Sequence, residues 1–417
     1  MRRTPVTTAS AAVLALGLGV VVCKGPTEPG RRIADLPREL SGDEASVVSA
    51  SNAFGFRLLA HVASAQPDSN IFLSPLSAAM ALAMTLNGAA GETFDSMRAV
   101  LALDDLPLDA INTSYRELIP LLRDLDPRVR FGIGNSIWVR ETFEIEQAFL
   151  ARTRENYDAE VSGLDFDDPA AADVINAWVA EATNGRITAI VEAPIDPLTM
   201  AFLINAIYFK GTWTFRFDPA QTRDAPFTRP GGSTVTVPLM HLKAVLPYAA
   251  TPNAQIVDLP YGGAAFSMTV VLPRPGVELD SFAASLDATR WGALLADLDS
   301  VEIDVALPRF RIEYETVLNE PLSALGMGVA FSPDFADFTP MYRYAREVGL
   351  HIEKVKQKTF VEVDEEGTEA AAATSVGVGV TSAPPSIVVD RPFLFAIRER
   401  FSGTVLFVGR VIDPTLE

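Results

Sequence analysis

Cysteine and histidine are both scarce in this chain. One cysteine, Cys23, and three histidines, His61, His241 and His351, occur among 417 residues. A single cysteine excludes an intrachain disulfide, and so few histidines leave little room for histidine-based catalysis or metal binding. The hydrolase motifs Gly-x-Ser-x-Gly and His-Glu-x-x-His are absent, as is a phosphate-binding loop. A hydrolase is therefore disfavoured, and we expect structural histidines, no metal and no cofactor.

Positive charge is also in short supply. The chain has 34 Lys and Arg against 53 Asp and Glu, which gives a net charge of -19. Nucleic acids and anionic membrane surfaces would repel such a chain, so we expect no nucleic-acid partner. With 48% hydrophobic and 21% charged residues, the composition is that of a globular protein that can bury a large core.

The first 42 residues lack the features of a folded domain. An apolar run of about a dozen residues from Ala11 to Val22 follows a basic start; it is too short to span a bilayer well and is arranged like an export signal. We therefore expect a signal peptide at 1–22, a flexible tether rich in Pro, Gly and charge at 23–42, and a protein that acts outside the cytoplasm. Cys23 ends the run, where a bacterial lipoprotein carries its lipidated cysteine; an ordinary cleaved signal with an incidental cysteine is the alternative.

The rest of the chain predicts helices first and many strands later. Apolar spacing predicts helices over 44–65, 75–87 and 170–183, and Ser74 followed by Pro75 is typical of a helix start. Strands are predicted at 131–139, 200–209, 235–240, 254–259, 266–272, 301–310, 359–364, 386–389, 393–397 and 405–411. This mixture indicates the α+β class.

Residues 368–381 combine a strand-like pattern with weak strand formers. Small or apolar residues occupy alternate positions from Thr368 to Val380, which would be one face of an extended strand. Ala and Gly, however, form strands poorly. Such a stretch suits a loop that later joins a sheet, and its roughly 14 residues would span about 46 Å when extended. A flexible Ala/Gly linker is the alternative.

Several longer motifs occur in order from about residue 45 to the C-terminus. They are Asn70-Ile-Phe-Leu-Ser-Pro-Leu-Ser77, Asn87-Gly-Ala-Ala-Gly-Glu-Thr93, Ile175-Asn-Ala-Trp178, Thr183-Asn-Gly-Arg-Ile187, Leu203-Ile-Asn-Ala-Ile-Tyr-Phe-Lys-Gly-Thr-Trp213, Leu307-Pro-Arg-Phe310, Leu325-Gly-Met327, Arg391-Pro-Phe393 and Phe407-Val-Gly-Arg-Val411. With these motifs the chain resembles the serpins. The resemblance implies one serpin domain over 43–417, with about nine helices, three β-sheets and an exposed reactive-centre loop at about 365–385.

The resemblance implies a suicide-substrate inhibitor of serine proteases, not an enzyme, and we expect a monomer. A protease attacks the loop and forms an acyl-enzyme, and the freed hinge then inserts into the main sheet before deacylation. Family spacing places the scissile bond at Thr381–Ser382, with Val380–Thr381 as the alternative. Small uncharged side chains there imply elastase-like or subtilisin-like targets. A non-inhibitory binding protein and a cysteine protease inhibitor remain alternatives.

The hinge resembles the form carried by inhibitory serpins. It reads Glu365-Glu-Gly-Thr-Glu-Ala-Ala-Ala-Ala373. The hinge residues implied by the family pattern are Glu365, Gly367, Thr368, Glu369, Ala370, Ala371, Ala372 and Ala373. Non-inhibitory members tend to carry bulky or charged residues where this chain has Thr368 and Ala370 to Ala373. Residues entering the middle of a sheet must not bring charge to its buried face.

The resemblance also assigns supporting roles. Ser74, Ser77 and Asn205 match a polar cluster that controls opening of the main sheet, although Ser74 could simply cap a helix. Gln357 stands where the family often has a His, and an amide cannot titrate.

Three further residues match positions at the top of that sheet. Trp213 matches an aromatic residue at the insertion point, where burial alone is also a fair account. Glu365 and Arg309 match a pair that often forms a salt bridge. An exposed pair would contribute only ~0–1 kcal/mol, but its place at the hinge would give it more weight.

Overall fold

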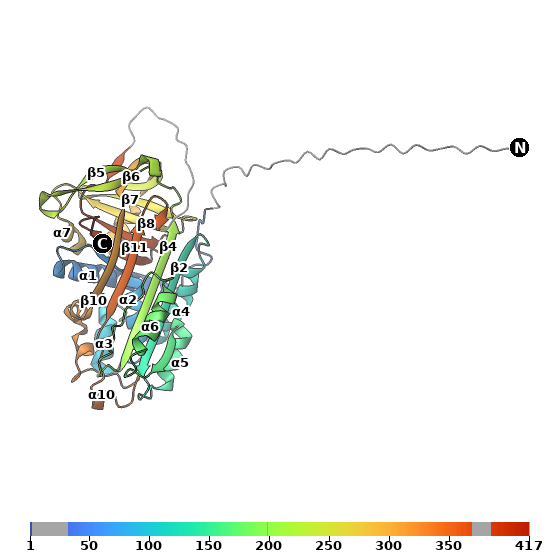
Figure 1. The fold of residues 1–417 in the computed structure, drawn as a ribbon, viewed down its shortest axis with the longest axis vertical. Coiled ribbons are helices and arrows are strands. Elements are labelled where there is room, and N and C mark those ends of the chain that lie inside the picture. The colour runs from blue at the N-terminus through green and yellow to red at the C-terminus, as the bar shows by residue number, and fades with distance from the viewer. Residues whose placement is uncertain (2–31, 198, 369–384, 417) are drawn as a thin grey trace. The chain divides into compact units, whose positions relative to one another are not determined.

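The computed structural model describes residues 1, 32–197, 199–368 and 385–416. Apart from Met1, the expected signal peptide lies outside these ranges, as do Cys23 and the expected scissile bond. From Arg32 onward the chain forms one compact unit (Figure 1). None of the helices described has the length and apolar character needed to cross a membrane.

Residues 32–41, expected to belong to the tether, lie against the domain. Ile33, Leu36 and Leu40 pack on the hydrophobic core. The guanidinium of Arg38 forms an ion pair with the buried carboxylate of Glu44 at 2.5 Å. The compact unit therefore begins at Arg32 rather than at residue 43.

Ten α-helices occur in the part of the chain that the structure describes, against about nine expected. In α1 (Gly42–Ala65), Ser41 and Glu44 form a capping box, since each side chain accepts a hydrogen bond from the other residue's N–H. As predicted, α2 (Pro75–Leu86) follows a Ser74 cap. The remaining helices are α3 (Gly91–Val100), α4 (Leu108–Arg123), α5 (Gln147–Tyr157), α6 (Ala171–Ala182), α7 (Leu279–Ala284), α8 (Ala288–Ala296), α9 (Asn319–Leu322) and α10 (Ala345–Val348).

The strands described form three sheets, as expected. Their bounds are β1 (Ile71–Leu73), β2 (Val129–Arg140), β3 (Glu160–Leu164), β4 (Ala201–Thr212), β5 (Arg223–Thr228), β6 (Thr234–Ala250), β7 (Ala254–Tyr261), β8 (Phe266–Pro273), β9 (Asp299–Pro308), β10 (Phe310–Val317), β11 (Lys356–Val363), β12 (Gly367–Thr368), β13 (Ser386–Val388), β14 (Phe393–Glu399) and β15 (Val405–Val411). The nine-stranded sheet has the order β1-β15-β14-β8-β7-β6-β9-β13, with β5 paired to β6. The other sheets are β12-β4-β2-β3 and β10-β11. Every predicted strand overlaps one of these, and the α+β class is confirmed.

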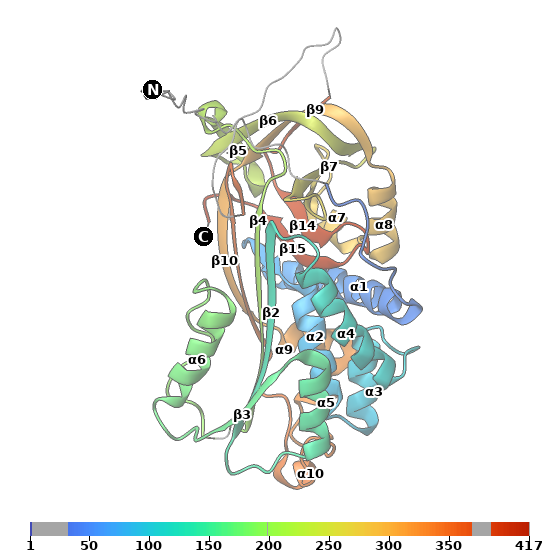
Figure 2. The same ribbon diagram turned by 90° about the vertical axis from the view of Figure 1, so that its right-hand side faces the viewer.

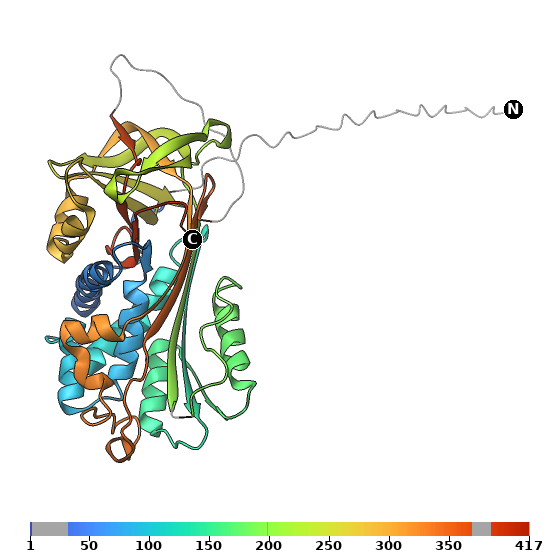
Figure 3. The same ribbon diagram turned by 60° about the vertical axis from the view of Figure 1, so that its left-hand side comes forward.

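Helices cover both faces of the four-stranded sheet. Figure 2 shows α6 on one side of β2 and β4, with α2, α4 and α5 on the other, and Figure 3 shows the same layers from another direction. On β4, Ile204 and Ala206 belong to the small core under α6, whereas Ile207 and Phe209 belong to the large core. Even positions of β4 therefore face α6 and odd positions face the large core, because side chains alternate along a strand.

Candidate functional site: the hinge and the open pair of strands

Two neighbouring strands, β4 and β11, contact each other without a hydrogen-bonded ladder among the residues described. Each is paired on its other edge, β4 with β2 and β11 with β10. At the top of β4, Gly367 and Thr368 pair antiparallel with Thr212 and Gly211. The hinge thus begins beside the top of both strands (Figure 1). We call β4 and β11 the open pair.

Gly367 allows the hinge to approach β4 closely. Its φ of +141° is one that residues with a side chain rarely adopt. A Cβ there would lie 2.2 Å from the carbonyl oxygen of Gly211 and 2.6 Å from Thr212 Cα. Any other residue would therefore push the hinge away from β4, which is a physical reason for glycine at this point of the pattern.

Donors just beyond the end of β4 hold the hinge carbonyls. Trp213 N–H donates to Glu366 O at 2.9 Å, and Phe217 N–H donates to Glu365 O at 3.1 Å. The indole Nε1–H of Trp213 donates to Asp364 O at 2.9 Å. Besides being buried, Trp213 therefore makes one hydrogen bond to the hinge and one to Asp364, the residue before it.

An ion pair fixes the hinge from a second direction. Arg309 Nε donates to the two carboxylate oxygens of Glu365 at 2.9 and 2.7 Å, and the Thr222 hydroxyl donates to the same carboxylate. Burial alone would raise the pKa of Glu365, but the hydrogen bonds from Arg309 and Thr222 outweigh it and hold the pKa below its ordinary value. The Glu365 side chain is only 5% exposed, so this is not an ordinary surface pair. We call Arg309, Thr222, Glu365, Trp213 and Phe217 the upper clasp.

The first turn of α2 holds both strands of the open pair. Ser74 N–H donates to Gln357 Oε1, and Gln357 Nε2 donates back to Ser74 O, both at 3.0 Å. The Ser77 hydroxyl donates to Asn205 Oδ1. Gln357 lies on β11 and Asn205 on β4. Ser74 Oγ also accepts Ser77 N–H at 3.2 Å, so Ser74 caps the helix as well.

Sequence reasoning missed one member of this cluster, Asn135 on β2. Asn205 Nδ2 donates to Asn135 Oδ1 at 2.5 Å, and Asn135 Nδ2 donates to Tyr157 O at 2.7 Å. The available signal in the sequence was an amide within the predicted strand 131–139, because a buried amide needs hydrogen-bond partners. We call Ser74, Ser77, Asn205, Gln357 and Asn135 the middle clasp.

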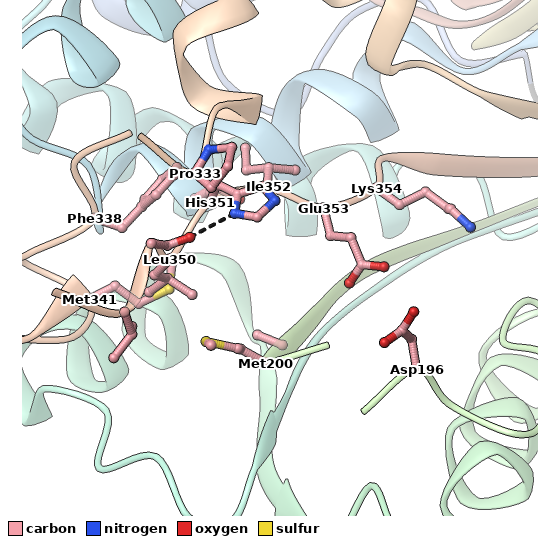
Figure 4. Close-up of a pocket in the computed structure, with 14 residues that line it drawn as sticks. Asp196, Met200, Pro333, Phe338, Met341, Leu350, His351, Ile352, Glu353 and Lys354 are labelled. Atoms are coloured by element: carbon pink, nitrogen blue, oxygen red, sulfur yellow. Dashed lines mark hydrogen bonds between the residues drawn. The ribbon is translucent and has the colours of Figure 1, made fainter. Parts of the chain in front are cut away.

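A cavity of about 310 Å³ lies at the lower end of the open pair, where β4 begins (Figure 4). Apolar side chains in its lining include Met200, Phe338, Met341, Leu350 and Ile352. His351 Nδ1 donates to Gly349 O at 2.7 Å, and the Thr199 hydroxyl donates to Glu353 at 2.8 Å. The upper end is therefore occupied by the hinge, whereas the lower end borders open space.

The other predicted loop positions lie outside the described residues. They are Glu369, Ala370, Ala371, Ala372, Ala373, Val380, Thr381 and Ser382, together with the lipidation candidate Cys23. The hinge positions that the structure describes are thus Glu365, Gly367 and the backbone of Thr368.

The chain matches the family model described as Serpin (serine protease inhibitor) over residues 49–414. The chain is a serpin. It is 37% identical to an uncharacterized serpin-like protein of Thermococcus kodakarensis, over 89% of this chain and 87% of that protein. It is 34% identical to the leukocyte elastase inhibitor of Bos taurus, over 88% of this chain and 99% of that protein.

Solved structures place this serpin in the same fold. The native state of the thermophilic serpin tengpin superposes with a TM-score of 0.80 at 30% identity, over 91% of this chain and 96% of tengpin. Serpins are in general protease inhibitors rather than catalytic enzymes, although some are non-inhibitory.

Proposed function

We propose that this serpin traps serine proteases by inserting its cleaved loop between β4 and β11 as a new strand. The pairing of Gly367 with Thr212 carries the proposal. Continued down β4 in the same register, it brings residue 378 opposite Ala201, the first residue of the strand. The 12 residues of β4 thus match the hinge and most of the loop in length.

The continued register also suits the side chains of the loop. Residues opposite each other in a ladder face the same side of a sheet. Positions 370 and 372 would fall opposite Phe209 and Ile207 and face the large core. Alanine fits such a site, whereas a charge would be costly there. Glu369 would fall opposite Lys210 near the top of the sheet, where the charges are complementary.

In this mechanism the protease supplies all the catalytic groups. Its serine Oγ attacks the carbonyl carbon of Thr381, the bond to Ser382 breaks, and the amino group of Ser382 leaves with a proton from the protease's histidine. An ester joins the two proteins until water attacks it. Insertion ahead of that water would carry the protease the length of β4, about 40 Å at ~3.3 Å per residue, and distort its active site.

We propose elastase-like or subtilisin-like proteases as the targets. Thr381, or Val380 in the alternative register, offers a small uncharged side chain before the scissile bond. No Lys or Arg occurs between Lys358 and Arg391, which disfavours trypsin-like enzymes. The similarity to a leukocyte elastase inhibitor supports this choice.

Trapping is tested by mixing the mature protein with pancreatic elastase and with subtilisin and running a denaturing gel. We expect a band at the summed mass and a cut after Thr381 or Val380. The Ala372→Arg variant should be cleaved without that band, because insertion would carry a charge opposite Ile207 and into the core, whereas Ala372→Ser should keep it. A band of equal strength from Ala372→Arg would rule out insertion as the trap.

We also propose export, with Cys23 as a candidate lipid anchor on the outer side of the cytoplasmic membrane and a monomeric inhibitory domain. If Cys23 is lipidated, Cys23→Ser should move the protein from the membrane fraction to the soluble fraction, because a hydrocarbon chain no longer holds it. An unchanged distribution after cell fractionation would favour an ordinary cleaved signal.

A further inference from the structure

Residues 32–36 lie against the segments that hold the hinge. Ile33 N–H donates to Gly263 O at 2.8 Å, and Ile33 Cδ1 lies 3.0 Å from where a Cβ on Gly263 would stand. The guanidinium carbon of Arg32 lies 5.3 Å from the centroid of the Phe215 ring. Leu36 packs on the core. We call residues 32–36 the N-terminal strap.

The turn under Ile33 is bonded to the end of β4. Gly262 N–H donates to Thr212 O at 2.8 Å. The ring of Tyr261, the last residue of β7 before this turn, stacks on Trp213 with 4.4 Å between the centroids. Thr212 and Trp213 are the residues that pair with Gly367 and hold the hinge carbonyl of residue 366. One hydrogen bond thus joins the strap to Gly263, and one hydrogen bond and one ring contact join the neighbouring residues to Thr212 and Trp213, which hold the hinge.

Arg32 reaches the same segment from a second point. Phe215 lies between Trp213 and Phe217, whose N–H groups both donate to hinge carbonyls. A cation over an aromatic face is attracted to it. The strap therefore acts on residues 212–217 at two points. Ile33 bonds to the turn that holds Thr212, and Arg32 lies over Phe215.

We propose that the N-terminal strap helps to prevent the chain after Thr368 from inserting between β4 and β11. Loosening it would free residues 212–217 to move and release the carbonyls of Glu365 and Glu366 more often. The chain after Thr368 would then insert between the two strands sooner. This last step rests on the proposed loop insertion, whereas the loosening of the hinge does not.

Amide hydrogen exchange on the full-length protein tests the loosening directly. We expect the amides of Trp213 and Phe217 to exchange about fivefold to tenfold faster in Ile33→Ala and in Arg32→Ala. Leu150→Ala, which truncates a partly buried side chain of α5 packed on the same core, is the matched control for Ile33. Arg98→Ala, which removes a cation lying over Phe94 in α3, is the control for Arg32. Both controls should leave these two amides unchanged.

Two results would overturn the proposal. Unchanged exchange at both amides in Ile33→Ala would show that the strap only covers the surface. Equal acceleration in Leu150→Ala would show that any loss of stability loosens the hinge.

Incubation at a raised temperature gives a second readout. Ile33→Ala should lose protease-trapping capacity about fivefold faster than the parent protein, as the hinge inserts without cleavage. Equal rates of loss would contradict the regulatory part. A parent protein that never traps a protease would contradict the proposed function alone, since the exchange result stands without it.

Discussion

The two clasps use different chemistry and hold different parts of the site. The upper clasp joins an ion pair, Arg309 with Glu365, to backbone hydrogen bonds, and it holds the hinge. The middle clasp uses only neutral side chains, and it holds both strands to α2. Acid can therefore weaken the first by protonating Glu365 but has no group to titrate in the second. Release of the hinge and separation of the strands can thus be tested apart.

The two edges of β4 show a related contrast. One edge pairs with β2 from Ala201 to Gly211. On the other edge the described residues provide two pairs, at Gly211 and Thr212. Backbone N–H and C=O groups need partners once water is excluded. A strand inserted beside β4 would supply such partners along this edge, and in the proposed mechanism this would contribute to the driving force.

The largest effect on trapping is expected when the hinge is forced off β4. In Gly367→Ala the new Cβ would collide with Gly211 O, and the φ of +141° would be strained. The inserted strand would begin with this same pair, so the strain would oppose insertion. Strain of this kind costs about 2 kcal/mol, and the ratio of trapping to hydrolysis should therefore fall about 30-fold. The ratio is read from covalent and cleaved bands on a gel. Gly403→Ala, at a positive φ with open space around it, should leave the ratio unchanged.

Breaking the middle clasp should reduce stability at every pH. Ser77→Ala removes the hydroxyl donor of Asn205 Oδ1 and leaves a partly buried acceptor short of a partner. The expected loss in the free energy of unfolding is about 2 kcal/mol, measured as a shift of the first urea transition. The same loss at pH 5 and pH 8 would support a neutral clasp. The exposed Ser46→Ala, whose hydroxyl bonds only within α1, should change little.

Breaking the upper clasp should give a smaller, pH-dependent loss. Glu365→Gln weakens the pairing with the half-exposed Arg309 by about 1–2 kcal/mol at pH 7. Because folding lowers the pKa of Glu365 from an ordinary 4.5, its contribution is present above that pH and is lost as the pH falls below it. The stability difference between the two proteins should therefore shrink between pH 5 and 3. A constant difference over that range would show that the charge of Glu365 is not what holds the hinge.

Sequence patterns predicted the parts of this site that local rules govern. Ser74 and Pro75 marked the start of α2, and apolar runs marked β4 and β11. The partners that complete the clasps, Asn135 and Thr222, were not predicted, because they come from elements distant in sequence whose approach depends on the whole fold.

The start of the domain was also not predicted, for a related reason. Pro, Gly and charge dominate residues 24–38 and favour a tether. Ile33, Leu36 and Leu40 nevertheless pack on the core, and their spacing of three and four residues was the only local sign of it. Composition averages over a segment, whereas packing depends on where its few apolar side chains lie.

A titratable residue in the middle clasp would make that neutral clasp depend on pH as well. Gln357 is buried, and Gln357→His can keep one of its two hydrogen bonds to Ser74 as a neutral ring. Burial disfavours the charged ring, so its pKa in the folded protein should lie below the ordinary value of about 6.5. The contribution of His at position 357 to the free energy of unfolding would then be present above that pH and lost as the pH falls below it. The expected loss is about 1 kcal/mol between pH 7.5 and 5. Urea transitions that stay parallel to those of the parent protein over this range would show that residue 357 is not enclosed between α2 and the open pair.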